Sequence, residues 1–162
     1  MKQYSSKIIA PRPSAVPVLA EAGFYLIKLY THNHDSLFGD VHNGCLELNG
    51  IGQIAADEWL RSAQAYPTLG LDEWIILPNR IEGIVSIREA SEPRRYGESA
   101  KLKPRLLSSF IASYKAAAAK RINLLTNAPG STIWQRNYQE RFIPDDLSLQ
   151  RVRQMLQKHP VL

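Results

Sequence analysis

Apolar and polar positions change their period several times along this 162-residue chain, and each change marks an expected element. The run Phe24–Thr31 is rich in aromatic and β-branched residues and predicts a strand. Residues 40–44 have turn chemistry with little periodicity, and Cys45–Leu48 after them predicts a second, short strand. Residues 51–64 then follow helical spacing with an apolar bias, and Asn49 can cap that helix.

The middle of the chain predicts a pair of strands. Asp72–Leu77 and Ile81–Ile87 are both apolar runs, and the break between them contains Pro78. Because this break is far too short for a parallel crossover, we expect the two strands to be antiparallel neighbours. Residues 89–103 are polar, charged and interrupted by proline and glycine, which predicts a loop.

The last third predicts a helix, a strand and a second helix. A long helix is expected over residues 104–125, because its alanine run is strong helix-forming material, and the turn residues 127–130 end it. Residues 133–143 predict a final strand. Asp145 or Asp146 then caps a terminal helix over residues 147–158.

The order strand, strand, helix, strand, strand, helix, strand, helix is typical of one architecture. It predicts an α+β fold of the ferredoxin-like sandwich type, an antiparallel sheet with helices mainly on one face. Residues 1–20 are rich in proline and serine and are expected to form a flexible N-terminal arm. Residues 21–162 are expected to form a single domain.

The charge of the chain is unevenly placed. Residues 1–90 hold seven Lys and Arg against ten Asp and Glu, a net charge of −3, whereas residues 91–162 hold thirteen against five, a net charge of +8. A basic C-terminal half is expected of a protein with a phosphate-rich partner such as nucleic acid. The alternative is a solvated basic face without a partner.

Composition excludes several classes of protein. Cys45 is the single cysteine, so neither an internal disulfide framework nor a paired-cysteine zinc site can form. No apolar run approaches the roughly 18 residues that span a bilayer, so no membrane partner is expected. Prolines interrupt the apolar stretch near the N-terminus, which argues against a signal peptide and predicts a cytoplasmic protein.

A series of segments, in a specific order, resembles a known family. The segments are Phe24–Lys28, Leu37–Asp40, Leu48–Ile54, Leu71–Asn79, Tyr114–Lys115, Lys120–Asn123 and Ile133–Tyr138. Together they resemble the REP-associated tyrosine transposases, a branch of the single-tyrosine HUH transposases, over about residues 24–160. No single segment is specific to this family, but the combined order of the segments is specific to it.

The resemblance implies a defined chemistry. Two histidines at alternate positions of a central strand lie on one face and, with a third polar ligand from the terminal helix, hold a divalent metal such as magnesium. The metal polarises a scissile phosphate. A tyrosine of the terminal helix attacks that phosphate and forms a covalent phosphotyrosine intermediate on single-stranded DNA.

In this chain the residues at the catalytic positions differ. Arg80 and Glu82 stand at the histidine positions, and Met155 stands at the tyrosine position. Arginine does not ligate metals, one carboxylate is not a three-ligand site, and a thioether cannot attack phosphorus. His159 falls where the third ligand would lie, but a frayed terminal residue is the simpler interpretation. We therefore expect no intact catalytic residue and no metal cofactor. Arg80 is expected to pair with acids such as Glu82 or Glu73, or else to contact a backbone phosphate.

Residues that could bind DNA remain. The expected set is Arg105, Lys115, Lys120 and Arg121 on the long helix, with Trp134, Arg136 and Tyr138 near the last strand, where Arg141 adds a further cation. The cations could line a broad basic face, and the two aromatic side chains could stack on unpaired bases. For Trp134 the alternative is core packing. The expected partner is DNA, single-stranded or in a hairpin, and a homodimer is compatible with the sequence.

Three functions follow as hypotheses. The first is a transposase relative that binds DNA and does not cut it. The second is an active metal-dependent single-strand transposase or nickase that uses atypical ligands. The third is a ferredoxin-like interaction module without a DNA partner.

Overall fold

The computed structural model describes residues 22–88 and 106–158. Within them the chain forms β1 (Gly23–Tyr30), η1 (His32–His34), β2 (Gly39–His42), β3 (Cys45–Leu48), α2 (Gly50–Ala63), β4 (Leu69–Leu77), β5 (Arg80–Ile87), α3 (Leu106–Leu125), β6 (Gln139–Ile143) and α4 (Asp146–Gln157). The predicted arm over residues 1–20, the predicted loop over 89–103, and Arg105 and His159 lie outside the described residues.

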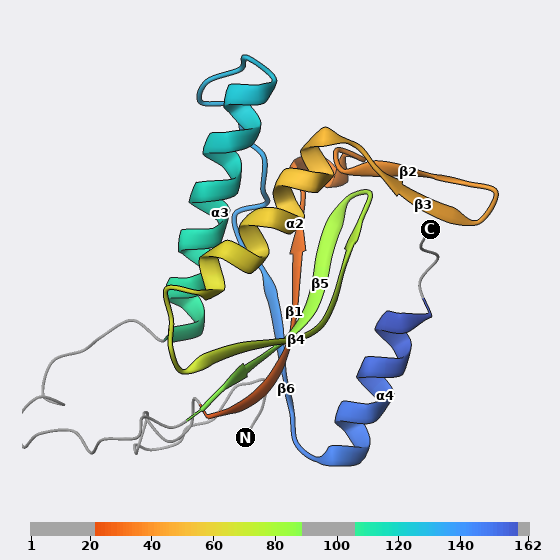
Figure 1. Ribbon diagram of the computed structural model, residues 1–162, viewed down its shortest axis with the longest axis vertical. Helices are drawn as coiled ribbons and strands as arrows, with labels where there is room; N and C mark the ends of the chain where they lie inside the picture. Colours follow the sequence, from red (N-terminus) through yellow and green to blue (C-terminus); the bar gives the residue numbers. More distant parts are fainter. Residues whose placement is uncertain (1–21, 89–105, 159–162) are drawn as a thin grey trace, which may run out of the picture.

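The main sheet has four strands in the order β4-β5-β1-β6, and its neighbouring strands are all antiparallel. The helices α2 and α3 cover one face of this sheet, and α4 covers part of the other (Figure 1). This arrangement confirms the predicted α+β sandwich with helices mainly on one face. It follows from two strand-helix-strand units that interleave, because each helix returns the chain to a strand that is not adjacent.

Two apolar cores lie on the two faces of the sheet. The larger one, under α2 and α3, is built around the fully buried Trp59, Phe110 and Tyr114. The smaller one contains residues that β1 and β5 present to α4, such as Leu26 and Ile84. Strand residues therefore divide by alternation into two sets, one facing α2 and α3 and the other facing α4.

The helix caps agree with the sequence. The side chain of Asn49 accepts a hydrogen bond from the Gly52 N–H at the start of α2. Asp145 does the same for the Ser148 N–H at the start of α4, which settles the choice between the two adjacent aspartates. Each bond satisfies a backbone donor that a helix leaves without a partner in its first turn.

The prediction of a turn over residues 40–44 was wrong in part. β2 pairs with β3 as a separate two-stranded ribbon, and the turn is confined to Asn43 and Gly44, whose φ angles are 52° and 78°. Positive φ at both positions is the requirement of a type I′ hairpin turn, for which Asn-Gly is favoured. The strand escaped prediction because most of β2 is exposed, so no apolar alternation marks it.

The final strand is shorter than predicted. β6 begins at Gln139, and in residues 133–138 the pairing is reduced to an isolated bridge between Trp134 and Thr31, the residue that follows β1. Ile133 and Trp134 are buried in the larger core. Their apolar side chains resemble the pattern of a strand, but they hold an irregular segment in the core next to α3.

Candidate functional site

Arg80 and Glu82 open strand β5 on the face that carries α4. Ile84, two residues further, belongs to the core under α4, whereas Ile81 belongs to the opposite core. Because alternate strand residues share a face, Arg80 and Glu82 share the α4 face. The side chains of Arg80 and Glu82 therefore lie next to each other on one face of the sheet.

Arg80 is held by three neighbours. Its Nε donates to Glu82 Oε2, its Nη1 donates to Asn79 Oδ1 at 2.9 Å, and its guanidinium lies 5.7 Å from the ring centre of Tyr30. The side chain of Glu82 is only 4% exposed and that of Arg80 is 26% exposed. The predicted local pairing of Arg80 with Glu82 is confirmed. A planar guanidinium suits this combination of a carboxylate and an aromatic face.

Strands β1 and β6 add further cations to the same face. Lys28 lies opposite Glu82 on one side and opposite Gln139 on the other, and Arg141 lies opposite Leu26. A groove of about 590 Å³ runs there, lined by Leu26, Lys28, Tyr138, Gln139, Glu140 and Arg141. The groove is open, and two of its lining side chains, Lys28 and Arg141, are cations on neighbouring strands.

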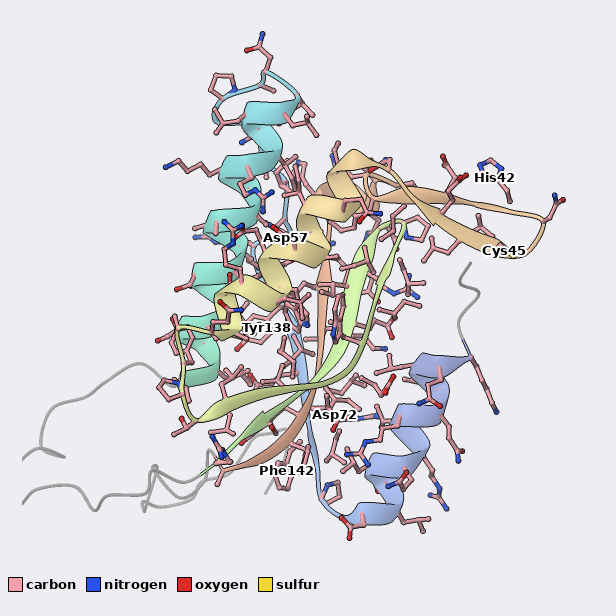
Figure 2. All side chains as sticks on the ribbon, viewed as in Figure 1. His42, Cys45, Asp57, Asp72, Tyr138 and Phe142 are labelled. Atoms are coloured by element: carbon pink, nitrogen blue, oxygen red, sulfur yellow. The ribbon has the colours of Figure 1, made fainter. Side chains whose placement is uncertain are left out.

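Helix α4 is fixed to the sheet by an ion pair as well as by its apolar side. Arg153 donates from Nε and Nη2 to the two carboxylate oxygens of Asp72 on β4, at 2.8 and 2.7 Å. Figure 2 shows Asp72 on the side of the sheet toward α4. The hydrogen bonds from Arg153 hold the pKa of Asp72 below its usual 3.8. A two-pronged pair of this kind sets the angle of the helix as well as its distance from the sheet.

Met155 stands on α4 beside the buried side of the helix. Its side chain contributes to a small hollow of about 350 Å³ with Arg151, Gln154 and Lys158, and the residue is 39% exposed. A thioether at this position can pack against a ligand but cannot act as a nucleophile toward phosphorus.

The cations predicted on α3 do not form one face. The Lys115 ammonium donates to the carbonyl oxygen of Gln135 at 2.9 Å and reaches those of Arg136 and Asn137 at 3.4 Å. Burial lowers the pKa of Lys115. Arg121 instead points to α2. Lys115 therefore stabilises the irregular segment 135–137 by hydrogen bonds to its carbonyl oxygens.

Arg121 forms the second structural pair of α3. Its Nη1 donates to Asp57 at 2.6 Å and to the buried Glu58 at 2.7 Å, and Figure 2 shows Asp57 between α2 and α3. By contrast, Lys120 and Arg136 are exposed. Arg141 on β6 is exposed as well, so of the predicted cations that the structure describes Lys120, Arg136 and Arg141 keep their charge toward solvent.

The two predicted stacking residues differ in their surroundings. Trp134 is 7% exposed, packs between Phe38 and Tyr114, and donates from Nε1 to the Lys115 carbonyl at 3.2 Å. For Trp134 the structure therefore shows packing in the core, which was the alternative to stacking on an unpaired base. Tyr138 is half-buried, and its hydroxyl donates to Glu140 at 2.9 Å. Its ring centre lies 5.9 Å from the Lys115 ammonium.

Metal-ligating side chains do not gather in the part of the chain that the structure describes. Among residues 22–88 and 106–158, no three His, Cys, Asp or Glu side chains come together as a metal site. Within these same ranges no helix is both long and apolar enough to cross a membrane.

Sequence reasoning missed Lys28 and Tyr30 as members of this face. A lone lysine inside the apolar run of β1 was a usable signal, because alternation places Lys28 on the face of Leu26 and Tyr30. Its nearness to Arg141 and Arg80 required the strand order, which no local pattern contains.

Comparisons with known proteins give one clear structural likeness. No family model matches the sequence. An uncharacterized protein of Haemophilus influenzae is 28% identical over 153 residues, which cover 86% of this chain and 81% of the relative. A REP-associated tyrosine transposase bound to a REP hairpin superposes with a TM-score of 0.50 at 12% identity, over 90% of this chain and 68% of that one. A crystal structure from Deinococcus radiodurans, provisionally assigned as a transposase, gives 0.47 at 13% identity, over 96% of this chain and 100% of that one. This chain therefore shares the fold of the hairpin-bound transposase.

Proposed function

We propose that this protein is a member of the REP-associated tyrosine transposase family that has lost strand cutting and binds DNA, single-stranded or in a hairpin. Two findings support it together. The fold is that of a transposase solved with a REP hairpin, and the ordered sequence segments that resemble the family lie within that fold.

The observation that carries the loss of cutting is the ion pair of Arg80 with Glu82. A divalent metal at this place needs neutral imidazoles or free carboxylate oxygens. Here the fixed positive charge of Arg80 occupies the position of one ligand and holds the carboxylate of the other. A second cation would meet both electrostatic repulsion and an oxygen that is already engaged.

The loss of the nucleophile is a separate argument. Met155 has no proton to give up and no oxygen with which to form a phosphotyrosine. Restoring cleavage would therefore require the metal ligands and the nucleophile together, because these groups act as one unit.

The DNA-binding part of the proposal rests on charge and on the fold. Lys120 and Arg136 are exposed cations in the basic half of the chain, and Arg105 belongs to the same stretch of sequence. Binding through phosphate contacts releases counterions, so the affinity should fall steeply as salt is added.

A labelled hairpin with a single-stranded extension tests both parts. At low salt we expect binding that weakens with added salt, and no covalent protein–DNA adduct on a denaturing gel with magnesium or manganese. An adduct would overturn the loss of cutting. Absence of binding at low salt would overturn the DNA partner and favour an interaction module.

A triple variant tests the placement of the catalytic positions. Arg80→His, Glu82→His and Met155→Tyr together should restore manganese binding, measured by calorimetry, more readily than cleavage. The matched control carries Met155→Tyr alone and should bind no manganese. If the triple variant also binds none, the assignment of these positions to the family's active site is wrong.

A further inference from the structure

The α4 face of the sheet carries three cations that lie on one diagonal across three strands. Arg80 of β5 lies opposite Tyr30 of β1; Lys28 of β1 lies two residues before Tyr30, and Arg141 of β6 lies opposite Leu26, two residues before Lys28. Each step of the diagonal joins neighbours of adjacent strands, about 7–8 Å apart and within reach of long side chains.

The charge on this diagonal is only partly balanced. Glu82 pairs with Arg80, and among residues 22–88 and 106–158 no ion pair engages Lys28 or Arg141. Glu140 also lines the groove, but it lies opposite Ile27, which packs in the core on the other face, and its carboxylate accepts from Tyr138. The diagonal therefore keeps a net positive charge.

Arg80 differs from a solvated surface arginine. Glu82, Asn79 and Tyr30 fix its Nε, its Nη1 and its plane, and leave Nη2 as a donor with no hydrogen-bond partner in the described part of the chain. A guanidinium that is already fixed loses little side-chain freedom when an anion binds its remaining edge.

We propose that this diagonal of Arg80, Lys28 and Arg141 is a metal-free site for the phosphodiester backbone of a nucleic acid strand. The inference rests on the proposed DNA binding and adds where and how the strand is held: the guanidinium that replaces the metal ligands takes over the contact with phosphate. Charges repeated along a line suit a polyanion with regularly spaced phosphates. A single buried pocket would suit a small anion, whereas the groove is open and is lined by Lys28 and Arg141, two of the three cations.

Equilibrium binding of fluorescent oligonucleotides in excess EDTA tests the proposal, with an unpaired strand and a hairpin as separate probes. The variants are Lys28→Gln, Arg141→Gln and Arg80→Gln. Arg61→Gln is the matched control, because it removes the same charge from the exposed side of α2, beyond the opposite face of the sheet. Thermal melting of each variant checks that it is folded, and Arg80→Lys separates loss of the planar fork from loss of charge.

The expected result is binding in EDTA, weakened by each of the three substitutions and unchanged by Arg61→Gln. The slope of log affinity against log salt should fall by about 0.7 for each cation lost on the unpaired strand. Weakening by Lys28→Gln and Arg141→Gln suffices if Arg80→Gln does not fold.

Two results would overturn the inference and leave DNA binding standing. One is binding that requires the metal and disappears in EDTA. The other is full affinity in Lys28→Gln and Arg141→Gln, with weakening by Lys120→Gln or Arg136→Gln, which would place the strand on exposed cations outside the diagonal. Absence of binding by the unmodified protein at low salt would overturn the proposed function itself.

Discussion

Gly52 gives a test in which helix propensity and tertiary packing predict opposite outcomes. It is the third residue of α2, where alanine is favoured over glycine by up to about 1 kcal/mol. A Cβ at this position would lie 2.2 Å from the carbonyl oxygen of Phe38 and 3.1 Å from Leu48 Cδ2. The first contact is with backbone, so a side-chain rotation cannot relieve it.

The magnitude follows from what must move. To restore an ordinary contact the start of α2 must retreat by about 1 Å, and this strains the bond from the Asn49 N–H to the Phe38 carbonyl, now 2.9 Å. Overpacking of this kind costs about 1–3 kcal/mol, so Gly52→Ala should lower the free energy of unfolding by about 2 kcal/mol. That loss corresponds to a Tm roughly 4–8 °C lower for a domain of this size.

Urea unfolding followed by circular dichroism measures the effect, with Gly50→Ala in the same helix as the matched control. A Cβ at Gly50 meets only Leu125 Cδ2 at 3.6 Å, an ordinary contact, so this variant should be neutral or more stable by up to about 1 kcal/mol. If Gly52→Ala is as stable as the unmodified protein, the close approach of α2 to Phe38 is not what positions this helix.

Two further predictions concern groups that join distant elements. Tyr114→Phe removes the buried hydroxyl that donates to the Ala55 carbonyl at 2.9 Å and should lower the free energy of unfolding by about 1 kcal/mol, measured by the same assay; no change would mean that the bond is weak in solution. Asp72→Asn should destabilise the protein at pH 6. Because Arg153 lowers the pKa of Asp72 in the folded state, its contribution exists above the usual value of 3.8 and disappears as the pH falls through the lowered pKa. Equal differences from the unmodified protein at pH 6 and at strongly acidic pH would refute this role.

Several features of the fold could be predicted because they depend on local geometry. The helix caps at Asn49 and Asp145 are local, because each side chain accepts a hydrogen bond from a backbone N–H only three residues further along the chain. That Arg80 and Glu82 share a face, and pair there, follows from the alternation of a strand. The order of elements was enough to indicate the sandwich. These are properties of neighbouring residues, and the sequence by itself determined them.

Other features depended on partners that lie far away along the chain. The sequence predicts that Lys115 and Arg121 are surface cations on a helix. In the structure Lys115 donates to backbone carbonyl groups near Gln135. Arg121 forms an ion pair with Asp57 and Glu58 of α2. The packing of distant elements decides which cations form structural hydrogen bonds and ion pairs. No periodicity within α3 carries that information.

The candidate site shows the same division most clearly. The sequence determined that Arg80 and Glu82 stand at alternate positions of one strand, and its resemblance to the transposase family led to the proposed loss of cutting. Only the strand order and register placed Lys28 and Arg141 beside them, because these residues belong to three strands separated by helices. Cross-strand neighbours are set by tertiary pairing, since backbone hydrogen bonds between strands fix which side chains share a face and a row.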